Sequence, residues 1–165
     1  MALTVLVVED EARTRSLVSR RLQAAGYRVV ESGSAEDALA AYPVATPDLV
    51  LIDIVLPGKS GLDLIDELQK QFPEARVVAM SGALDADVPT LLRQSRERGA
   101  VLALAKPFTT ERLLDVVDQA LRAPAEPATT RIEKHVPAPE RVRWGLLAAL
   151  GLVVLAMFLI ALMRG

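Results

Sequence analysis

Apolar residues along this chain follow two patterns, short unbroken runs and longer stretches with three- and four-residue spacing. Five short runs are typical of strands in a buried parallel sheet; they lie at residues 3–8, 28–31, 49–53, 76–80 and 101–105. Helical spacing follows each of them, at residues 12–25, 35–42, 61–71, 85–98 and 110–121. Strands alternating with helices of these lengths predict an α/β fold, a (βα)5 unit with a five-stranded parallel sheet and right-handed crossovers.

Residues at the ends of these stretches support the predicted boundaries. Ser34, with Asp37 three residues later, resembles a capping box that begins the second helix. Gly26 suits the position just beyond the end of the first helix. We expect Pro43 and Pro47 to end the second helix, because proline cannot continue the helical hydrogen bonding.

After Arg122 the composition changes. Residues 123–140 hold four prolines and no apolar periodicity, which predicts a linker. Residues 144–163 are 20 uncharged residues in a row; as a helix they would measure about 30 Å, the thickness of a bilayer core. The chain is therefore predicted to divide into a domain at 1–122, a proline-rich linker, and a juxtamembrane segment with a single transmembrane helix at 141–165.

The apolar tail has other interpretations. It could be a helix buried in a protein core or the seam of an oligomer, although an all-round apolar stretch after a linker favours a membrane span. Within it, Gly145 and Ala149 form a pair of small residues four apart, which could pack two such helices together in a homodimer.

The charge distribution indicates location and excludes some functions. Residues 1–122 carry 14 Lys/Arg and 18 Asp/Glu, whereas residues 123–165 carry 5 and 3. Neither part has the concentrated positive charge of a nucleic-acid binder. The amino terminus lacks the features of a signal peptide, and the absence of cysteine excludes disulfides. Arg141 and Arg143 before the apolar stretch outnumber Arg164 after it, so we expect a single-pass protein of the cytoplasmic membrane with its first domain in the cytoplasm.

Chemistry-bearing side chains follow the predicted strands. Glu9 and Asp10, Asp53, Ser81 and Lys106 all fall at or just after strand ends, which meet at the carboxyl edge of a parallel sheet, where such folds bind ligands. Three crowded carboxylates repel one another unless a cation lies between them, and hard oxygen ligands suit Mg²⁺. Acids at this point also complement a helix N-terminus, a role compatible with metal binding.

That layout predicts phosphoryl chemistry. Asp53 would attack phosphorus as a carboxylate nucleophile and form an acyl phosphate. The Lys106 ammonium would neutralise a phosphoryl oxygen, and the Ser81 hydroxyl could contact another. The alternative, that Asp53 is an ordinary surface turn residue, leaves the other strand-end groups unexplained.

Four segments carry a resemblance to a known family: VVEDE at 7–11, LVLIDIVLPGKSGLDL at 49–64, VVAMSG at 77–82 and LAKPF at 104–108. Together they resemble the receiver domain of bacterial two-component response regulators (CheY-like) over residues 3–122. The resemblance implies a flavodoxin-like fold with strand order 2-1-3-4-5. It implies Asp53 as the phosphoacceptor. It also implies a Mg²⁺ site made of Asp53, Asp10 as a direct ligand, Glu9 largely through water, and the backbone carbonyl of Val55.

The resemblance also assigns the phosphate-sensing groups. Ser81 resembles the switch hydroxyl and Lys106 the phosphate-sensing lysine, and the Lys106–Pro107 peptide is expected to be cis. One position departs from the family pattern: Ala103 stands where an aromatic residue or histidine is common. An alanine cannot swing a ring inward, which puts the usual conformational switch in doubt.

The resemblance implies a function and leaves rivals. We expect a membrane-anchored receiver that takes its phosphoryl group from a histidine kinase or phosphotransfer protein, catalyses only its own phosphorylation and dephosphorylation, and signals through an unknown downstream protein. The alternative is a membrane-tethered scaffold that works without phosphorylation. A stand-alone phosphatase is disfavoured because no substrate-capping insertion is present. His135 is expected to be a solvated linker residue rather than a phosphate carrier.

Overall fold

A computed structural model describes residues 2–82 and 87–123. Within them, strands and helices alternate along the chain: β1 Thr4–Val8, α1 Ala12–Ala24, β2 Arg28–Ser32, α2 Ala35–Ala45, β3 Leu49–Asp53, α3 Gly61–Gln71, β4 Val77–Ser81, α4 Val88–Glu97, β5 Leu102–Ala105 and α5 Thr110–Arg122. The five strands are parallel in the order β2-β1-β3-β4-β5. This is the predicted flavodoxin-like fold, and the predicted strand order is confirmed.

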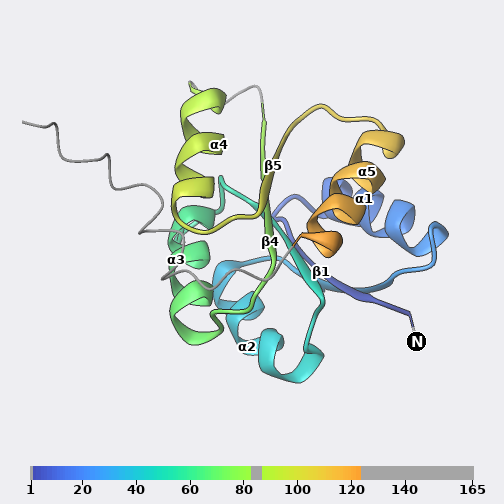
Figure 1. Cartoon of the computed structure of the whole chain (residues 1–165), viewed down its shortest axis with the longest axis horizontal. Coiled ribbons are helices and arrows are strands. Elements are labelled where there is room, and N and C mark those ends of the chain that lie inside the picture. The colour runs from blue at the N-terminus through green and yellow to red at the C-terminus, as the bar shows by residue number, and fades with distance from the viewer. Residues whose placement is uncertain (1, 83–86, 124–165) are drawn as a thin grey trace, which may run out of the picture. The chain divides into compact units, whose positions relative to one another are not determined.

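Helices cover the sheet on both faces (Figure 1). α1 and α5 lie on one side, and α2, α3 and α4 lie on the other. Successive residues of a strand point to opposite faces, so Val5 and Val7 of β1 pack beneath α1 and α5, while Leu6 and Val8 pack beneath α2 and α3. Burial on both faces explains why β1, β3 and β4 are continuous apolar runs in the sequence.

Side chains cap the helices largely where the sequence predicts. The Ser34 hydroxyl accepts a hydrogen bond from the Asp37 N–H at 3.1 Å, and that of Thr109 accepts one from the Arg112 N–H at 3.2 Å. Gly26, with φ +91°, lies directly after the last turn of α1. These bonds satisfy backbone donors that a helix start leaves without partners.

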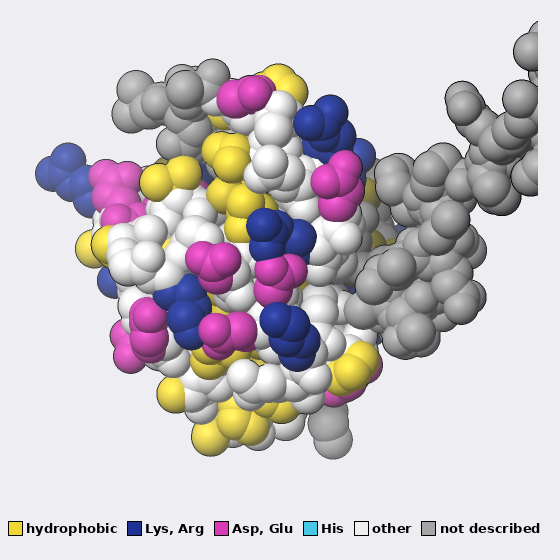
Figure 2. Space-filling model, turned by 90° about the vertical axis from the view of Figure 1, so that its left-hand side faces the viewer, with side chains coloured by type: hydrophobic (Ala, Val, Ile, Leu, Met, Phe, Trp, Pro, Cys, Tyr) yellow, Lys and Arg dark blue, Asp and Glu magenta, His cyan; other side chains and the backbone are white. Residues whose placement is uncertain are grey.

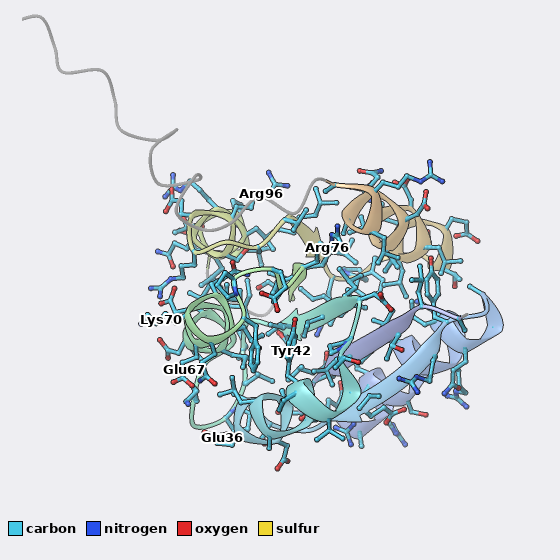
Figure 3. All side chains as sticks on the ribbon, turned by 60° about the horizontal axis from the view of Figure 1, so that its bottom comes forward. Glu36, Tyr42, Glu67, Lys70, Arg76 and Arg96 are labelled. Atoms are coloured by element: carbon cyan, nitrogen blue, oxygen red, sulfur yellow. The ribbon has the colours of Figure 1, made fainter. Side chains whose placement is uncertain are left out.

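The prediction that Pro43 ends the second helix was wrong. Pro43 lies inside α2, which continues to Ala45 and ends where Thr46 adopts a left-handed conformation. A proline near the end of a helix removes only one backbone hydrogen bond, and packing outweighs that loss. Tyr42 points inward (Figure 3) and stacks on Phe72 of the α3 terminus with ring centroids 4.3 Å apart, which holds this last turn against the core.

α4 has the fewest buried residues of the described helices. It begins at Val88, capped by the Asp87 carboxylate, rather than at residue 85 as predicted. Ser95 is its one fully buried residue, and Leu91 and Leu92 are only partly buried. Few apolar contacts are typical of segments that move easily.

Several predictions fall on residues that the structure does not describe. The linker at 123–140, of which only Ala123 is described, and the apolar stretch at 144–163 are among them, as are His135, Gly145 and Ala149. Among the described helices, none has the length and apolar character needed to cross a bilayer.

Candidate functional site

The strand register brings the predicted site residues to one edge of the sheet. Glu9 follows β1, Asp53 ends β3, Ser81 ends β4 and Lys106 follows β5. Val8 pairs with Ile52, Asp53 with Met80, and Ser81 with Ala105, so the carboxyl ends of all four strands lie level with one another. Residues separated by up to 97 positions in the chain therefore meet at this edge.

Three carboxylates cluster there. One oxygen from each of Glu9, Asp10 and Asp53 lies within 4.8 Å of the others. Glu9 and Asp53 are only 2% and 7% exposed, while Asp10 is exposed. Three hard oxygen donors, two of them buried and one open to solvent, form a cradle that a small divalent cation can reach.

Lys106 lies against this cluster. Its Nζ donates hydrogen bonds to Glu9 Oε2 at 2.6 Å and to Asp53 Oδ2 at 2.5 Å. Burial raises the pKa of Glu9, and the nearby Asp53 charge adds to that rise, although the hydrogen bond from Lys106 opposes it. Burial alone would lower the pKa of Lys106, but its hydrogen bonds and charge attraction to the two carboxylates outweigh this and raise that pKa.

The residues present fit a magnesium ion. Three carboxylates and one ammonium give the cluster a formal charge of −2, which a divalent cation would neutralise. The Lys106 ammonium lies between Glu9 and Asp53 and supplies one positive charge there. The oxygen-only donor set matches the preference of Mg²⁺ for carboxylates and water.

The second oxygen of Asp53 is also held. Oδ1 accepts a hydrogen bond from the Val55 N–H at 3.0 Å, so the turn after β3 orients the carboxylate. Ser81 is fully buried, and its carbonyl oxygen accepts a hydrogen bond from the Lys106 N–H at 2.7 Å. The Lys106–Pro107 peptide is cis, the isomer expected from the sequence. Ala103 lies in β5, half-buried and paired with Ala79.

Two residues that support the site were not assigned a role from the sequence. A Cβ added to Gly61 would overlap the Asp53 carbonyl oxygen and lie 2.7 Å from Ile54 Cα, so only glycine allows α3 to start this close to the end of β3. Arg15 of α1 donates hydrogen bonds to the backbone carbonyls of Glu9 and Asp10. Arg15 is the fourth residue of α1, about one turn into the helix, and its partners are backbone carbonyls, so no motif in the sequence singles it out.

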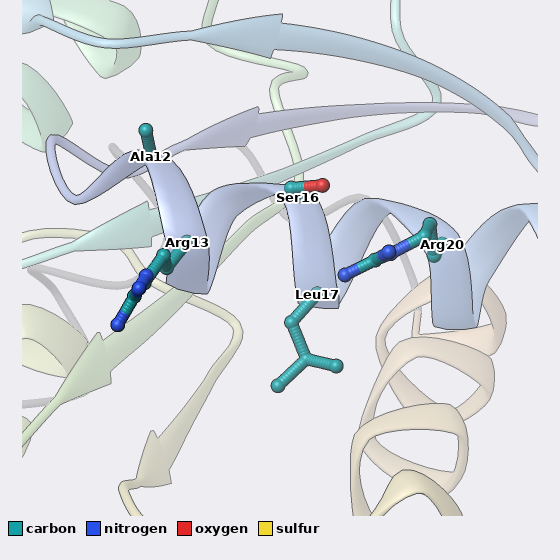
Figure 4. A pocket seen from close by; sticks show the side chains of 5 residues that line it. All are labelled: Ala12, Arg13, Ser16, Leu17 and Arg20. Carbon is teal, nitrogen blue, oxygen red and sulfur yellow. The ribbon is translucent and has the colours of Figure 1, made fainter.

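The exposed surface of α1 begins at Ala12, one residue after the acid pair Glu9 and Asp10 and the N-cap residue Glu11. A shallow hollow on it is lined by Ala12, Arg13, Ser16, Leu17 and Arg20 (Figure 4). Leu17 is 43% exposed between the two arginines. This surface combines an apolar contact with positive charge next to an otherwise acidic edge.

Comparisons with known proteins agree with this geometry. The sequence model of the response regulator receiver domain matches residues 5–118. The DNA-binding transcriptional regulator NtrC of Azospirillum brasilense is 33% identical over 129 residues, 77% of this chain but 26% of that protein. Sporulation initiation phosphotransferase F of Bacillus subtilis is 28% identical over 71% of this chain and 92% of its own length.

Solved structures show the same similarity. The receiver domain of NtrX from Brucella abortus is 39% identical, with a TM-score of 0.67 over 71% of this chain and 97% of that one. A response regulator from Chloroflexus aurantiacus, described as putative, gives 0.68 at 28% identity, over 74% of this chain and all of that chain. This chain spans about a quarter of the length of the first curated relatives that it matches.

Proposed function

This chain belongs to the response regulator receiver family, and from that premise we propose that Asp53 accepts a phosphoryl group from a histidine kinase or a phosphotransfer protein. The observation that carries the proposal is the convergence of three carboxylates and Lys106 at one edge of the sheet. As a receiver, the domain is a phosphoacceptor rather than an enzyme acting on an external substrate. DNA binding is stated for the Azospirillum protein, of which this chain spans 26%.

The transfer step uses Asp53 as a nucleophile. One carboxylate oxygen forms a bond to phosphorus while the phosphorus–nitrogen bond of the donor's phosphohistidine breaks, and the imidazole leaves with that electron pair. The Val55 N–H and the Lys106 ammonium hold the two carboxylate oxygens beforehand, so the nucleophile is oriented before the donor arrives.

Charge is the main obstacle to this step, because a phosphoryl group must approach a cluster of carboxylates. We propose that Asp10 and Asp53 bind Mg²⁺ directly, together with the Val55 carbonyl, and that Glu9 binds it through water. When bound, the ion offsets negative charge on the phosphoryl oxygens. Lys106 exchanges its bond to Asp53 for one to a phosphoryl oxygen, and the Ser81 hydroxyl contacts another.

We propose that the donor approaches along α1. The Arg13, Leu17 and Arg20 surface adjoins the acid pair and offers an apolar contact flanked by positive charge, which suits a partner helix with acidic residues (Figure 4). The donor's histidine would then lie over the edge that holds Asp53.

Output is proposed to occur through protein contacts. On the face shown in Figure 2, acidic and basic side chains are interspersed rather than sorted by sign; Lys59 with Glu67 and Arg98 with Asp66 are ion pairs of α3 and its neighbouring segments. Such a mixed surface suits recognition of one protein partner better than attraction of a polyanion.

Ala103 supports a second candidate function. With no ring at this position of β5, phosphorylation has no aromatic side chain to move, so a scaffold that keeps the receiver shape without switching is the alternative. The two candidates differ in whether phosphate changes the domain.

We further propose that residues 144–163 anchor the protein in the cytoplasmic membrane with the receiver on the cytoplasmic side. The support is sequence alone: 20 uncharged residues, with two arginines on one side and one on the other. An amino-terminal fluorescent fusion tests this. Recovery of the fusion in the soluble fraction, with the tail intact, would refute the anchor.

A direct test of the phosphoacceptor uses mass spectrometry. Incubation with Mg²⁺ and a small acyl phosphate should add one phosphoryl group, and both chelation of Mg²⁺ and Asp53→Asn should prevent the gain. A gain that persists in Asp53→Asn would refute Asp53 as the acceptor. Turnover of an external phosphomonoester would instead indicate a phosphatase.

A further inference from the structure

Arg15 connects the helix α1 back to the loop that presents the acid pair. Its Nη1 donates a hydrogen bond to the Glu9 carbonyl oxygen at 2.6 Å and lies 3.2 Å from the carbonyl oxygen of Asp10. Its Nε lies 3.5 Å from Glu31 Oε2, in the neighbouring strand β2. The guanidinium is therefore placed between the β1–α1 loop and the end of β2.

These contacts fix the backbone on which the acids stand. The Glu9 N–H donates to the Ser32 carbonyl at 3.1 Å, so β2 holds one side of this residue and Arg15 holds the other. Two consecutive carbonyls that point at one guanidinium nitrogen fix the peptide plane between them. These contacts thereby set the direction of the Cα–Cβ bond of Asp10, although the Asp10 side chain is exposed.

Arginine is suited to this task for a geometric reason. Its planar guanidinium carries five N–H donors in a rigid fork, so it can bind two carbonyls with one nitrogen and a carboxylate with another. A lysine offers a single ammonium on a flexible stem. The Arg15 side chain is only 21% exposed, so neighbouring atoms restrict its movement in this geometry.

We propose that Arg15 is a positioning residue that sets the affinity of the acid cluster for Mg²⁺ by holding the Glu9–Asp10 backbone. This inference rests on the proposed function, because it assumes that the cluster binds the ion. Arg15 touches neither the ion nor the phosphoryl group and acts through the two carbonyls.

The charge of Arg15 and its positioning role predict opposite changes in Mg²⁺ affinity when Arg15 is replaced, and this makes the proposal testable. Its positive charge near the carboxylates repels a second cation, so charge alone predicts that Arg15→Ala binds Mg²⁺ more tightly. Loss of positioning predicts weaker binding, by about 10–100-fold, the usual effect of removing a group that orients metal ligands. The direction of the change decides between them.

The experiment is a calorimetric Mg²⁺ titration of the full-length chain in nonionic detergent. Arg15→Ala and Arg15→Lys should both weaken binding, and the lysine variant does so without a change in charge. Arg13→Ala is the matched control, because it removes the same charge from an exposed position of the same helix; its affinity should be unchanged or slightly tighter. Phosphoryl uptake by the Arg15 variants should recover at saturating Mg²⁺, a recovery that general damage to the fold would not give.

The outcomes separate two kinds of failure. Wild-type affinity in Arg15→Lys, or tighter binding in Arg15→Ala, would overturn the positioning role while leaving the metal site intact. No Mg²⁺ binding by the wild type would overturn both this inference and the proposed site. If Arg15→Ala unfolds, Arg15→Lys decides alone, and circular dichroism identifies that case.

Discussion

The side-chain nitrogen of Lys106 lies 2.6 Å from Oε2 of Glu9, although 97 residues separate them in the chain. The same nitrogen lies 2.5 Å from Asp53 Oδ2. One ammonium thus stabilises two buried acids from different strands, in the place where we propose that a divalent cation binds. The protein's stability and its metal affinity are therefore coupled at this point.

Replacement of Lys106 by Met should destabilise the protein when Mg²⁺ is absent. Glu9 and Asp53 would then face each other without an opposite charge, and we expect a loss of about 1–3 kcal/mol, since part of the full penalty for breaking a buried pair is relieved by solvent at the sheet edge. Mg²⁺ should restore much of this loss. Urea unfolding with EDTA or with Mg²⁺ measures both values.

Lys59→Met provides the control for that experiment. Lys59 also pairs with a carboxylate, Glu67, but both side chains are partly exposed, and such pairs contribute little. Its replacement should leave stability nearly unchanged and insensitive to Mg²⁺. Equal effects of the two substitutions would show that the position of Lys106 in the acid cluster has no special importance.

The stability of the metal-free protein should fall as the pH rises above about 4.5, the ordinary pKa of glutamate. Burial raises the pKa of Glu9, so between 4.5 and the raised folded-state pKa the folded state binds more protons at Glu9 than the unfolded state, and stability decreases with pH. Glu9→Gln should flatten this dependence. The test is the urea midpoint in EDTA measured at a series of pH values.

Lys106 makes its contribution to the pH dependence of stability in the alkaline range. Its pKa is raised, so its stabilising effect is complete below the unfolded value, about 10.4, and is lost as the pH rises through the folded value. The difference between wild type and Lys106→Met should therefore disappear only at strongly alkaline pH. A difference that vanished near neutrality would contradict this assignment.

Most of the fold was predictable because its determinants are local or periodic. β1, β3 and β4 are buried on both faces, which produces continuous apolar runs. The polar groups at their ends reach one edge because parallel strands end together. Ser34 was recognised as a cap from its spacing to Asp37. The strand order came from the family resemblance rather than from any pattern in the residues.

The remaining features depend on distances that spacing does not encode. Pro43 was assigned as a helix end because its missing N–H is a local property, while the stacking of Tyr42 that holds the turn is a tertiary one. The bond between Glu9 and Lys106 depends on the reach of both side chains. Arg15 was missed because its partners are backbone carbonyls, which no sequence pattern reveals.

Gly61→Ala should impair both stability and phosphorylation. The new Cβ would overlap the Asp53 carbonyl oxygen and lie 2.7 Å from Ile54 Cα. These are backbone atoms, which cannot move aside at low free-energy cost as the end of a flexible side chain can. We expect a loss of about 1–3 kcal/mol, as for other overpacked sites, together with slower phosphoryl uptake because Asp53 is displaced. Urea unfolding and time-resolved mass spectrometry measure the two effects.

Gly58→Asn is the matched control for Gly61. Gly58 lies in the same loop with φ +74° and has no atom within 4 Å of an added Cβ, and asparagine tolerates left-handed backbone better than other side chains. This variant should keep nearly normal phosphoryl uptake. If both variants slowed uptake equally, loop flexibility rather than the close approach at Gly61 would be the cause.

Phosphorylation should change the region around Asp53 without altering β5 and α4, because Ala103 has no ring that could follow a movement of Ser81. Ala103 is half-buried, so Ala103→Tyr can place a ring at the surface or inward, and it should extend the phosphorylation-dependent change in hydrogen exchange to β5 and α4. Ala103→Val controls for added bulk without a ring and should behave like the wild type. The measurement is hydrogen–deuterium exchange with and without a small acyl phosphate.

A wild type in which phosphorylation already changes exchange throughout α4 would contradict this prediction. It would show that this receiver switches by a route that needs no aromatic residue at position 103, and the scaffold alternative would then be excluded.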